Sequence, residues 1–179
     1  MKNFEEKIIK DFSVVFDFCQ RYNKQKNPLL AGSATARIVC HHLNSARECI
    51  LSSIPTSNYI KLSSSISWGS GKFPRVPWIA FHLQGKKVSN ALSVVICFSK
   101  DGRGVVVGLM AAATLSTKLK TVTRTKHSEY LNINSSTRTQ YNNKFLNPKE
   151  FFSNQLNLQD VINHIIESIN LLYENQTDL

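Results

Sequence analysis

The chain has 179 residues, of which 42% are hydrophobic, and its 22 Lys and Arg outnumber its 12 Asp and Glu to give a net charge of +10. This hydrophobic fraction supports a folded core and excludes a wholly disordered chain. No apolar run reaches the roughly 18 residues that span a bilayer, and residues 1–10 contain two Glu and lack the apolar stretch of a secretory signal. We therefore expect a cytoplasmic protein.

Two amphipathic helices are predicted in the N-terminal third of the chain. Apolar residues recur at three- and four-residue steps over about residues 3–21 and again over about 33–52. Asn27-Pro28 separates the two helices, and Pro55 ends the second one.

The central part of the chain has a strand pattern. Residues 59–67 alternate between apolar and polar side chains, which is typical of a strand with one buried face. A loop rich in Gly and Pro follows over 68–77, and further strands are predicted at 78–83, 93–99 and 104–110. Asp101-Gly102 is a hairpin-turn signal, so we expect the last two strands to pair antiparallel. Residues 111–144 give no clear pattern.

The C-terminal part is predicted to be helical. Asn147-Pro148-Lys149-Glu150 resembles a helix start, with a capping Asn, a Pro at the first position and an acid in the first turn. Apolar residues at helical spacing continue from Leu158 to Tyr173. The whole chain is therefore predicted to be one α+β domain, with a mostly antiparallel or mixed central sheet flanked by N- and C-terminal helices. Its parts are a helical segment (1–57), a strand-rich centre (58–147) and C-terminal helices (148–179).

The positive charge is concentrated in the centre. Residues 58–147 hold 13 basic and 2 acidic side chains, whereas 148–179 hold 1 basic and 5 acidic ones. A long segment whose only acids are Asp101 and Glu129 is typical of a surface that binds a polyanion. A basic surface that serves solubility is the alternative.

Residues that would support catalysis or metal binding are scarce. A Mg²⁺-dependent nuclease needs neighbouring carboxylates, and the centre has only Asp101, which belongs to a turn, and Glu129. His41 and His42 are adjacent, so on a helix they point about 100° apart and do not form a chelating pair. The cysteines contain no CxxC pair and are expected to be free thiols; they are Cys19, Cys40, Cys49 and Cys97. We predict no catalytic residue, no metal site and no cofactor.

The loop over 68–77 combines residue types that contact nucleic acids. Glycines let the backbone approach a phosphate, Lys and Arg neutralise it, and an exposed aromatic ring can stack on bases or wedge between them. For the two aromatic residues of the loop, packing beneath it is the alternative. The predicted contacts are Trp68, Gly69, Ser70, Gly71, Lys72, Phe73 and Arg75, with Lys86 and Lys87 widening the basic face.

Four short stretches of the centre also form a recognisable pattern. They are Tyr59-Ile-Lys-Leu-Ser, Gly69-Ser-Gly-Lys-Phe73, Val76-Pro-Trp-Ile-Ala-Phe81 and Ser89-Asn-Ala-Leu-Ser-Val-Val-Ile96. This pattern resembles the N-terminal DNA-recognition domain of McrB-type modification-dependent restriction proteins. The resemblance is specific over about residues 58–110, and the terminal helix also fits the family.

The resemblance implies a domain that binds DNA and, in the best-known member, flips a modified cytosine into a pocket. The family Tyr that helps to displace the base falls at Ser70, which is too small to wedge; Trp68 or Phe73 could replace it. Asn90 belongs to the matched Ser-Asn pair and joins the expected DNA contacts. The expected pocket residues are Trp78, which matches an aromatic wall, and Ser93, Cys97 and Tyr141 at other wall positions.

In the family, an AAA+ GTPase motor follows the recognition domain and a nuclease is a separate subunit. Neither is expected within these residues, so the chain is either an excised domain or a stand-alone specificity module. The leading hypothesis is a DNA-binding specificity domain, not itself an enzyme, whose partner is double-stranded DNA with or without a modified base. An RNA-binding or protein-interaction module and a small nuclease are the alternatives.

Overall fold

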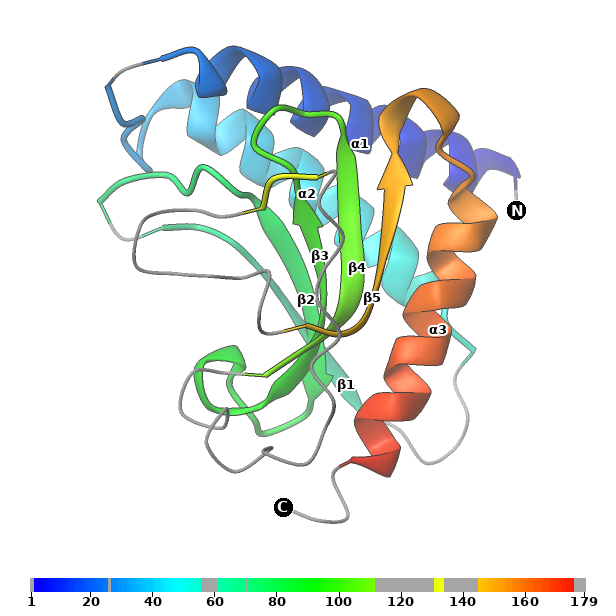
Figure 1. Cartoon of the computed structure of the whole chain (residues 1–179). Coiled ribbons are helices and arrows are strands. Elements are labelled where there is room, and N and C mark those ends of the chain that lie inside the picture. The colour runs from blue at the N-terminus through cyan, green and yellow to red at the C-terminus, as the bar shows by residue number, and fades with distance from the viewer. Residues whose placement is uncertain are drawn as a thin grey trace.

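The computed structural model describes residues 2–25, 27–55, 61–69, 71–111, 131–133 and 145–175. Within these ranges three α-helices and five strands form an α+β fold with helices at both ends, which confirms the predicted class (Figure 1). The helices are α1 (Lys2–Asn23), α2 (Ala34–Ser53) and α3 (Leu158–Glu174). The strands are β1 (Leu62–Ile66), β2 (Trp78–Leu83), β3 (Leu92–Phe98), β4 (Gly104–Ala111) and β5 (Phe145–Phe152).

The five strands form one antiparallel sheet in the order β1-β2-β3-β4-β5, so each strand pairs with its neighbour in sequence. The predicted strand 78–83 is β2, and 93–99 and 104–110 pair as β3 and β4 in the expected hairpin. The first predicted strand, 59–67, is observed as β1, which begins at Leu62; residues 59 and 60 lie outside the described ranges.

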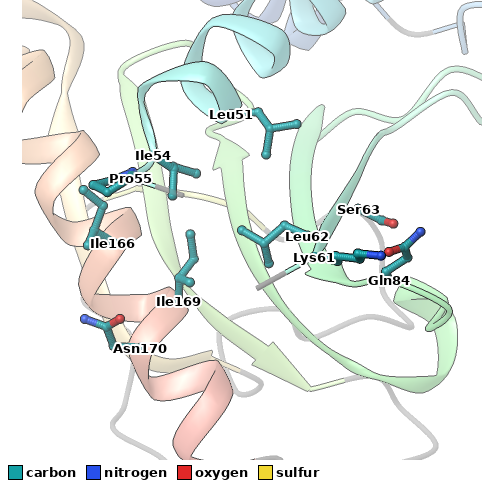
Figure 2. A pocket seen from close by; sticks show the side chains of 10 residues that line it. All are labelled: Leu51, Ile54, Pro55, Lys61, Leu62, Ser63, Gln84, Ile166, Ile169 and Asn170. Atoms are coloured by element: carbon teal, nitrogen blue, oxygen red, sulfur yellow. The ribbon is translucent and has the colours of Figure 1, made fainter. Parts of the chain in front are cut away.

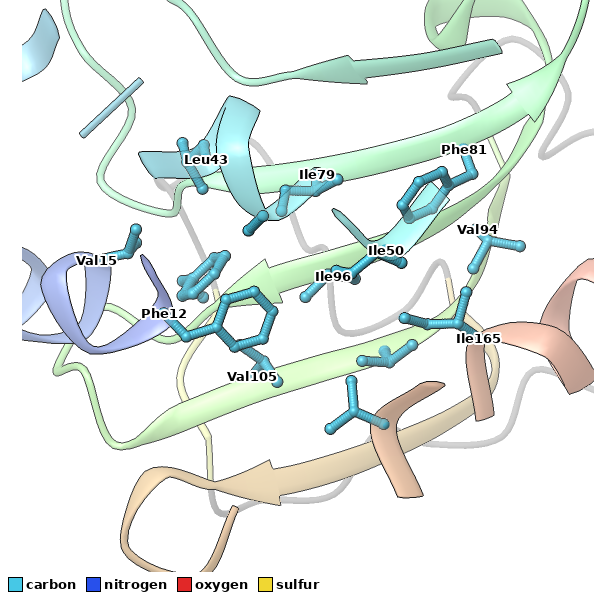
Figure 3. Close-up of a cluster of buried hydrophobic side chains, with 14 of the residues drawn as sticks. Phe12, Val15, Leu43, Ile50, Ile79, Phe81, Val94, Ile96, Val105 and Ile165 are labelled. Atoms are coloured by element: carbon cyan, nitrogen blue, oxygen red, sulfur yellow. The ribbon is translucent and has the colours of Figure 1, made fainter. Parts of the chain in front are cut away.

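All three helices pack on one face of the sheet, where they form the main core. Strand side chains alternate between faces, so Ile79 and Phe81 on β2 point toward the helices, as do Val94 and Ile96 on β3. Figure 3 shows the centre of this core, to which α1 contributes Phe12 and Val15, α2 contributes Leu43 and Ile50, and α3 contributes Ile165. The apolar faces of the three helices therefore form one continuous buried layer against the sheet. In the described part of the chain, no helix is both long and apolar enough to cross a membrane.

The opposite face of the sheet carries a smaller apolar cluster. Its members include Ala80, Val95, Cys97, Val106 and Phe145 from the strands and Leu131 and Ile133 from the segment 131–133. Backbone hydrogen bonds hold this segment in place, because the Lys100 N–H donates to the Asn132 carbonyl and the Leu131 N–H donates to the Glu150 carboxylate. Both faces of the sheet are therefore covered near its centre.

The predicted helix start at residues 147–150 is wrong, because these residues belong to the edge strand β5. Pro148 is tolerated there, since β5 pairs on one side only and its register with β4 shifts between Val107 and Leu109. Asn147 has a φ of 48° at this bulge, and its carbonyl accepts a hydrogen bond from His164 Nε2 of α3 at 3.0 Å. Burial of the flanking aromatic residues on both sheet faces outweighs the local capping signal.

The N-cap of α3 lies ten residues after the predicted cap. Asn157 is the N-cap, and its side-chain oxygen accepts hydrogen bonds from the backbone N–H groups of Gln159 and Asp160. A short 3₁₀ turn, η3 (Ser153–Gln155), connects β5 to this helix. The segment 148–179, predicted to be helical throughout, therefore starts with the end of a strand.

Candidate nucleic-acid interface

The predicted DNA loop connects β1 to β2 and depends on two glycines in the left-handed region. Gly69 and Gly71 have φ of 75° and 80°. A Cβ on Gly69 would clash with the Lys72 carbonyl oxygen, so the chain turns too tightly there for any other residue. The turn leaves Lys72 exposed and Trp68 53% exposed, as a nucleic-acid contact requires.

A second loop, between α1 and α2, is bonded to this turn. The Ala31 N–H donates to the Gly71 carbonyl at 3.1 Å, and the Phe73 N–H donates to the Leu29 carbonyl at 2.8 Å. Leu30 lies opposite Lys72 in an isolated antiparallel bridge. We name this unit, residues 27–33 and 68–75 without Ser70, the two-loop tip. Ser70 itself lies outside the described residues.

Aromatic packing anchors the two-loop tip on α1. Phe73 is only 2% exposed, and its ring meets that of Phe18 edge-on at 5.4 Å. Phe18 also stacks on Tyr22, whose hydroxyl accepts a hydrogen bond from the Leu29 N–H at 2.7 Å. Phe73 is therefore a buried support of the loop, as in the alternative considered from the sequence, and is not available to contact DNA.

Arg75 is held between the two loops. Its guanidinium lies 5.2 Å from the centre of the Tyr22 ring and donates a hydrogen bond to the Gln25 carbonyl at 3.1 Å. These contacts leave the side chain half-buried. A guanidinium fixed in this way presents its charge at a defined position rather than on a freely moving side chain.

The two-loop tip belongs to a larger cation-rich region that we name the loop end (residues 17–25, 27–37, 67–77 and 99–104, without Ser70). The β3–β4 hairpin joins it, because the Phe98 N–H donates to the Pro77 carbonyl and Gly102 packs directly against α1. Its acids are Asp17 and Asp101. Its seven cations are Arg21, Lys24, Arg37, Lys72, Arg75, Lys100 and Arg103.

The other predicted DNA contacts lie at the opposite end of the sheet. Lys86 and Lys87 are exposed in the connection from β2 to β3, and Asn90 belongs to the short 3₁₀ turn η1 (Val88–Asn90). Strand β2 separates this connection from the loop end by about 20 Å, given about 3.4 Å per residue. The structure therefore does not bring Lys86, Lys87 and Asn90 together with the two-loop tip.

Three of the four predicted pocket residues project from the same sheet face, the one opposite the helices. Trp78 on β2 pairs with Cys97 on β3, and Ser93 lies four residues before Cys97 on the same strand. Trp78 is half-buried beside the smaller cluster, whereas Cys97 is fully enclosed and its burial raises the pKa of the thiol to about 12. The buried Ser93 hydroxyl has no hydrogen-bond partner among the described residues. Tyr141 lies outside those residues.

Of the two acidic residues considered for catalysis, Asp101 lies within the described ranges. Asp101 accepts a hydrogen bond from Arg103 Nε at 2.6 Å. Partial burial raises the pKa of Asp101, but hydrogen bonds from Arg103 and Ser99 outweigh this effect and leave the pKa below its ordinary value. Within the described ranges, no group of three His, Cys, Asp or Glu side chains could hold a metal ion. Glu129 lies outside those ranges.

One titratable pair lies in the helical layer. His42 Nδ1 of α2 donates a hydrogen bond to Asp11 Oδ1 of α1 at 2.7 Å, and Asp11 is 4% exposed. Because the carboxylate is buried between the helices, this contact fixes α1 against α2. Neither residue belongs to the loop end.

A separate cavity of about 490 Å³ lies at the other end of the molecule, between α2, β1 and α3 (Figure 2). Apolar side chains make up most of its wall, with Lys61, Gln84 and Asn170 as polar members. We name this region the turn end (residues 45–55, 61–64, 82–92 and 166–175). It holds four cations, Arg47, Lys61, Lys86 and Lys87, and three acids, Glu48, Glu167 and Glu174.

Residues 27–33 belong to the candidate site, although the Asn27-Pro28 pattern predicts only a break between two helices. Leu29 and Leu30 directly after this break were the available signal, because two consecutive apolar residues are unusual in a solvent-exposed connection. Their role depends on pairing with residues about 40 positions further along the chain. Local apolar periodicity gives no information about such distant contacts.

No protein-family model matches the sequence, and no curated protein matches it either. The resemblance over residues 58–110 therefore stays a prediction.

Proposed function

We propose that this chain is the DNA-binding specificity domain of a McrB-like, modification-dependent restriction system. The observation that carries the proposal is the excess of positive charge at the loop end, which contains seven cations, two acids and a glycine turn. Contacts between cations and phosphates supply most of the affinity for duplex DNA, and backbone N–H groups in a tight turn can add to them. Among the residues that the structure describes, the turn end holds four cations and three acids and has no comparable excess.

Recognition of a modified base is the finer part of the proposal and rests on the face that carries Trp78. A half-buried indole provides a stacking surface on this face, beside which Ser93 is fully buried. In this proposal the two-loop tip holds the duplex, while a base taken out of the stack is read beside Trp78.

The remaining features of the proposal concern the system around the domain. The chain selects the DNA, and an AAA+ GTPase motor and a nuclease subunit carry out translocation and cleavage. It acts in the cytoplasm, where foreign DNA arrives, and has no catalytic residues of its own. Incubation of the chain with plasmid and Mg²⁺ or Mn²⁺ should leave the plasmid intact. Nicking that disappears in Asp101→Asn would contradict the non-enzymatic assignment.

The deciding experiment measures affinity for four duplexes of one sequence: unmodified DNA, methylcytosine DNA, hydroxymethylcytosine DNA and RNA. We expect tight binding of DNA that weakens with salt, because four or five released counterions reduce affinity on the order of 10²-fold between 50 and 200 mM salt. A preference for one modified duplex supports the finer proposal. Tighter binding to RNA favours the RNA-binding alternative, and salt-independent binding rules out a phosphate-binding loop end.

A further inference from the structure

The two-loop tip carries an unusually exposed apolar side chain. Leu30 is 66% exposed, the highest value among the large hydrophobic residues that the structure describes. Single exposed apolar residues are common on protein surfaces. Leu30 differs because it stands in a turn directly opposite Lys72, with Trp68 also exposed in the adjoining loop.

The position of Leu30 is fixed by its two neighbours. Leu29 is bonded through its N–H to the Tyr22 hydroxyl and through its carbonyl to the Phe73 N–H, and Ala31 is bonded to Gly71. Tyr22, which belongs to α1, and Phe73, which packs on Phe18 of the same helix, are both buried. Because the backbone on each side of Leu30 is tied down, little conformational entropy is lost when the side chain enters a binding partner.

The charges around Leu30 favour a nucleic acid over a protein as that partner. Lys72 lies opposite it, and Lys24, Arg37 and Arg75 lie in the adjoining segments of the loop end. An apolar residue surrounded by cations is the arrangement with which proteins enter the minor groove, where Leu, Phe, Ile or Met separates neighbouring base pairs and kinks the duplex.

We propose that Leu30 is an apolar wedge that enters a base step of duplex DNA and bends it, while Lys72 and Arg75 hold the adjacent phosphates. This inference rests on the proposed DNA-binding function and adds the deformation of the duplex and the residue responsible for it. Partial unstacking of the base step is unfavourable, and the additional contacts that the bent DNA makes with the loop end offset this cost.

Bending is measured by energy transfer between dyes at the two ends of a duplex of about 25 bp, which is short enough to be nearly straight when free. At saturating protein we expect wild type to bend the duplex by about 20–90°. Leu30→Ala should lose the increase in energy transfer while its affinity falls less than about tenfold and its salt dependence stays unchanged, because no charge is removed. Lys72→Ala should bind more weakly, with a reduced salt dependence, but still bend the duplex at saturation.

The matched control is Ile9→Ala, which shortens another exposed aliphatic side chain, 42% exposed, about 20 Å along α1 from Tyr22. Ile9→Ala should bind and bend like wild type. If wild type binds the duplex but leaves it straight, the wedge is overturned and the proposed function stands. If Leu30→Ala bends the duplex as wild type does, the wedge is also overturned. If wild type binds no duplex, the proposed function fails and the wedge fails with it.

Discussion

The two ends of the sheet use their loops in opposite ways. At the loop end, two connections far apart in sequence are bonded together, cations outnumber acids by seven to two, and Leu30 and Trp68 are exposed. At the turn end, the charges of the described residues nearly balance, and apolar side chains from α2, β1 and α3 line a cavity (Figure 2). Among the described residues, one end of the sheet therefore gathers cations and exposed apolar side chains, and the other end encloses apolar space.

This difference shows that net charge alone does not locate an interface. Lys86 and Lys87 contribute to the basic centre of the sequence as much as Lys72 and Arg75 do. Among the residues that the structure describes, the loop end adds to its cations a glycine turn supported by the buried rings of Phe73 and Phe18. If the DNA interface lies at the loop end, removing one cation there should weaken DNA binding more than removing one cation at the turn end.

The largest expected effect is a loss of stability when an aromatic ring that supports the two-loop tip is removed. Phe73→Ala removes a buried ring that packs on Phe18 and should lower the free energy of unfolding by about 3–5 kcal/mol. Urea denaturation measures this loss. Trp68→Ala in the same loop is the control, because its exposed ring should change stability by less than about 0.5 kcal/mol. Equal losses in the two variants would contradict the distinction between a buried and an exposed aromatic residue.

The next effect concerns base selection at the sheet face that carries Trp78. Trp78→Ala should reduce the preference for a modified duplex by about 1–3 kcal/mol, if the indole stacks on a base as aromatic rings do on single strands. Competition binding between modified and unmodified duplexes measures this change. Trp78→Phe retains a stacking ring and should keep most of the preference. A large drop in melting temperature with an unchanged preference would assign Trp78 to the core instead.

Local sequence patterns predicted most of the fold but only part of the site. The helices and the β3–β4 hairpin follow from apolar spacing and from Asp101-Gly102, which act over a few residues. Asn147-Pro148 matches a helix-capping pattern, so the sequence predicts a helix start there. In the structure both residues belong to β5, because pairing with β4 overrides this local pattern. Likewise, Phe73 and Leu30 have opposite exposures that depend on the contact between two distant loops.

A smaller effect tests the comparison of the two ends directly. Lys72→Ala should weaken binding of every duplex about fivefold and reduce the salt slope by about one, because a phosphate contact carries little sequence information. Lys86→Ala removes the same charge at the turn end and should change affinity by less than about twofold. Binding titrations at several salt concentrations measure both variants. Equal losses would mean that the DNA-binding surface extends over both ends of the sheet.

The smallest effect arises at Asp101, where stability and binding should change in opposite directions. Asp101 holds Arg103 by a hydrogen bond of 2.6 Å, and its pKa lies below the ordinary value of 3.8. A carboxyl whose pKa is lowered on folding stabilises the protein above its ordinary pKa, and this contribution is lost as the pH falls through the lowered pKa. Asp101→Asn should therefore reduce stability at pH 7 by about 0.5 kcal/mol, a difference that closes at acid pH.

The same substitution removes one of the two acids of the loop end and releases Arg103 from its ion pair, so affinity for duplex DNA should rise about twofold to threefold. Urea denaturation at pH 7 and at about pH 3, together with binding titrations, separates the two effects. Asp17→Asn is the matched control, because it removes the other acid of the loop end from an exposed position on α1 and should raise affinity with little change in stability. If Asp101→Asn leaves duplex affinity unchanged while the fold is intact, the β3–β4 hairpin does not face the DNA, and the interface is confined to the two-loop tip and the adjoining helix ends.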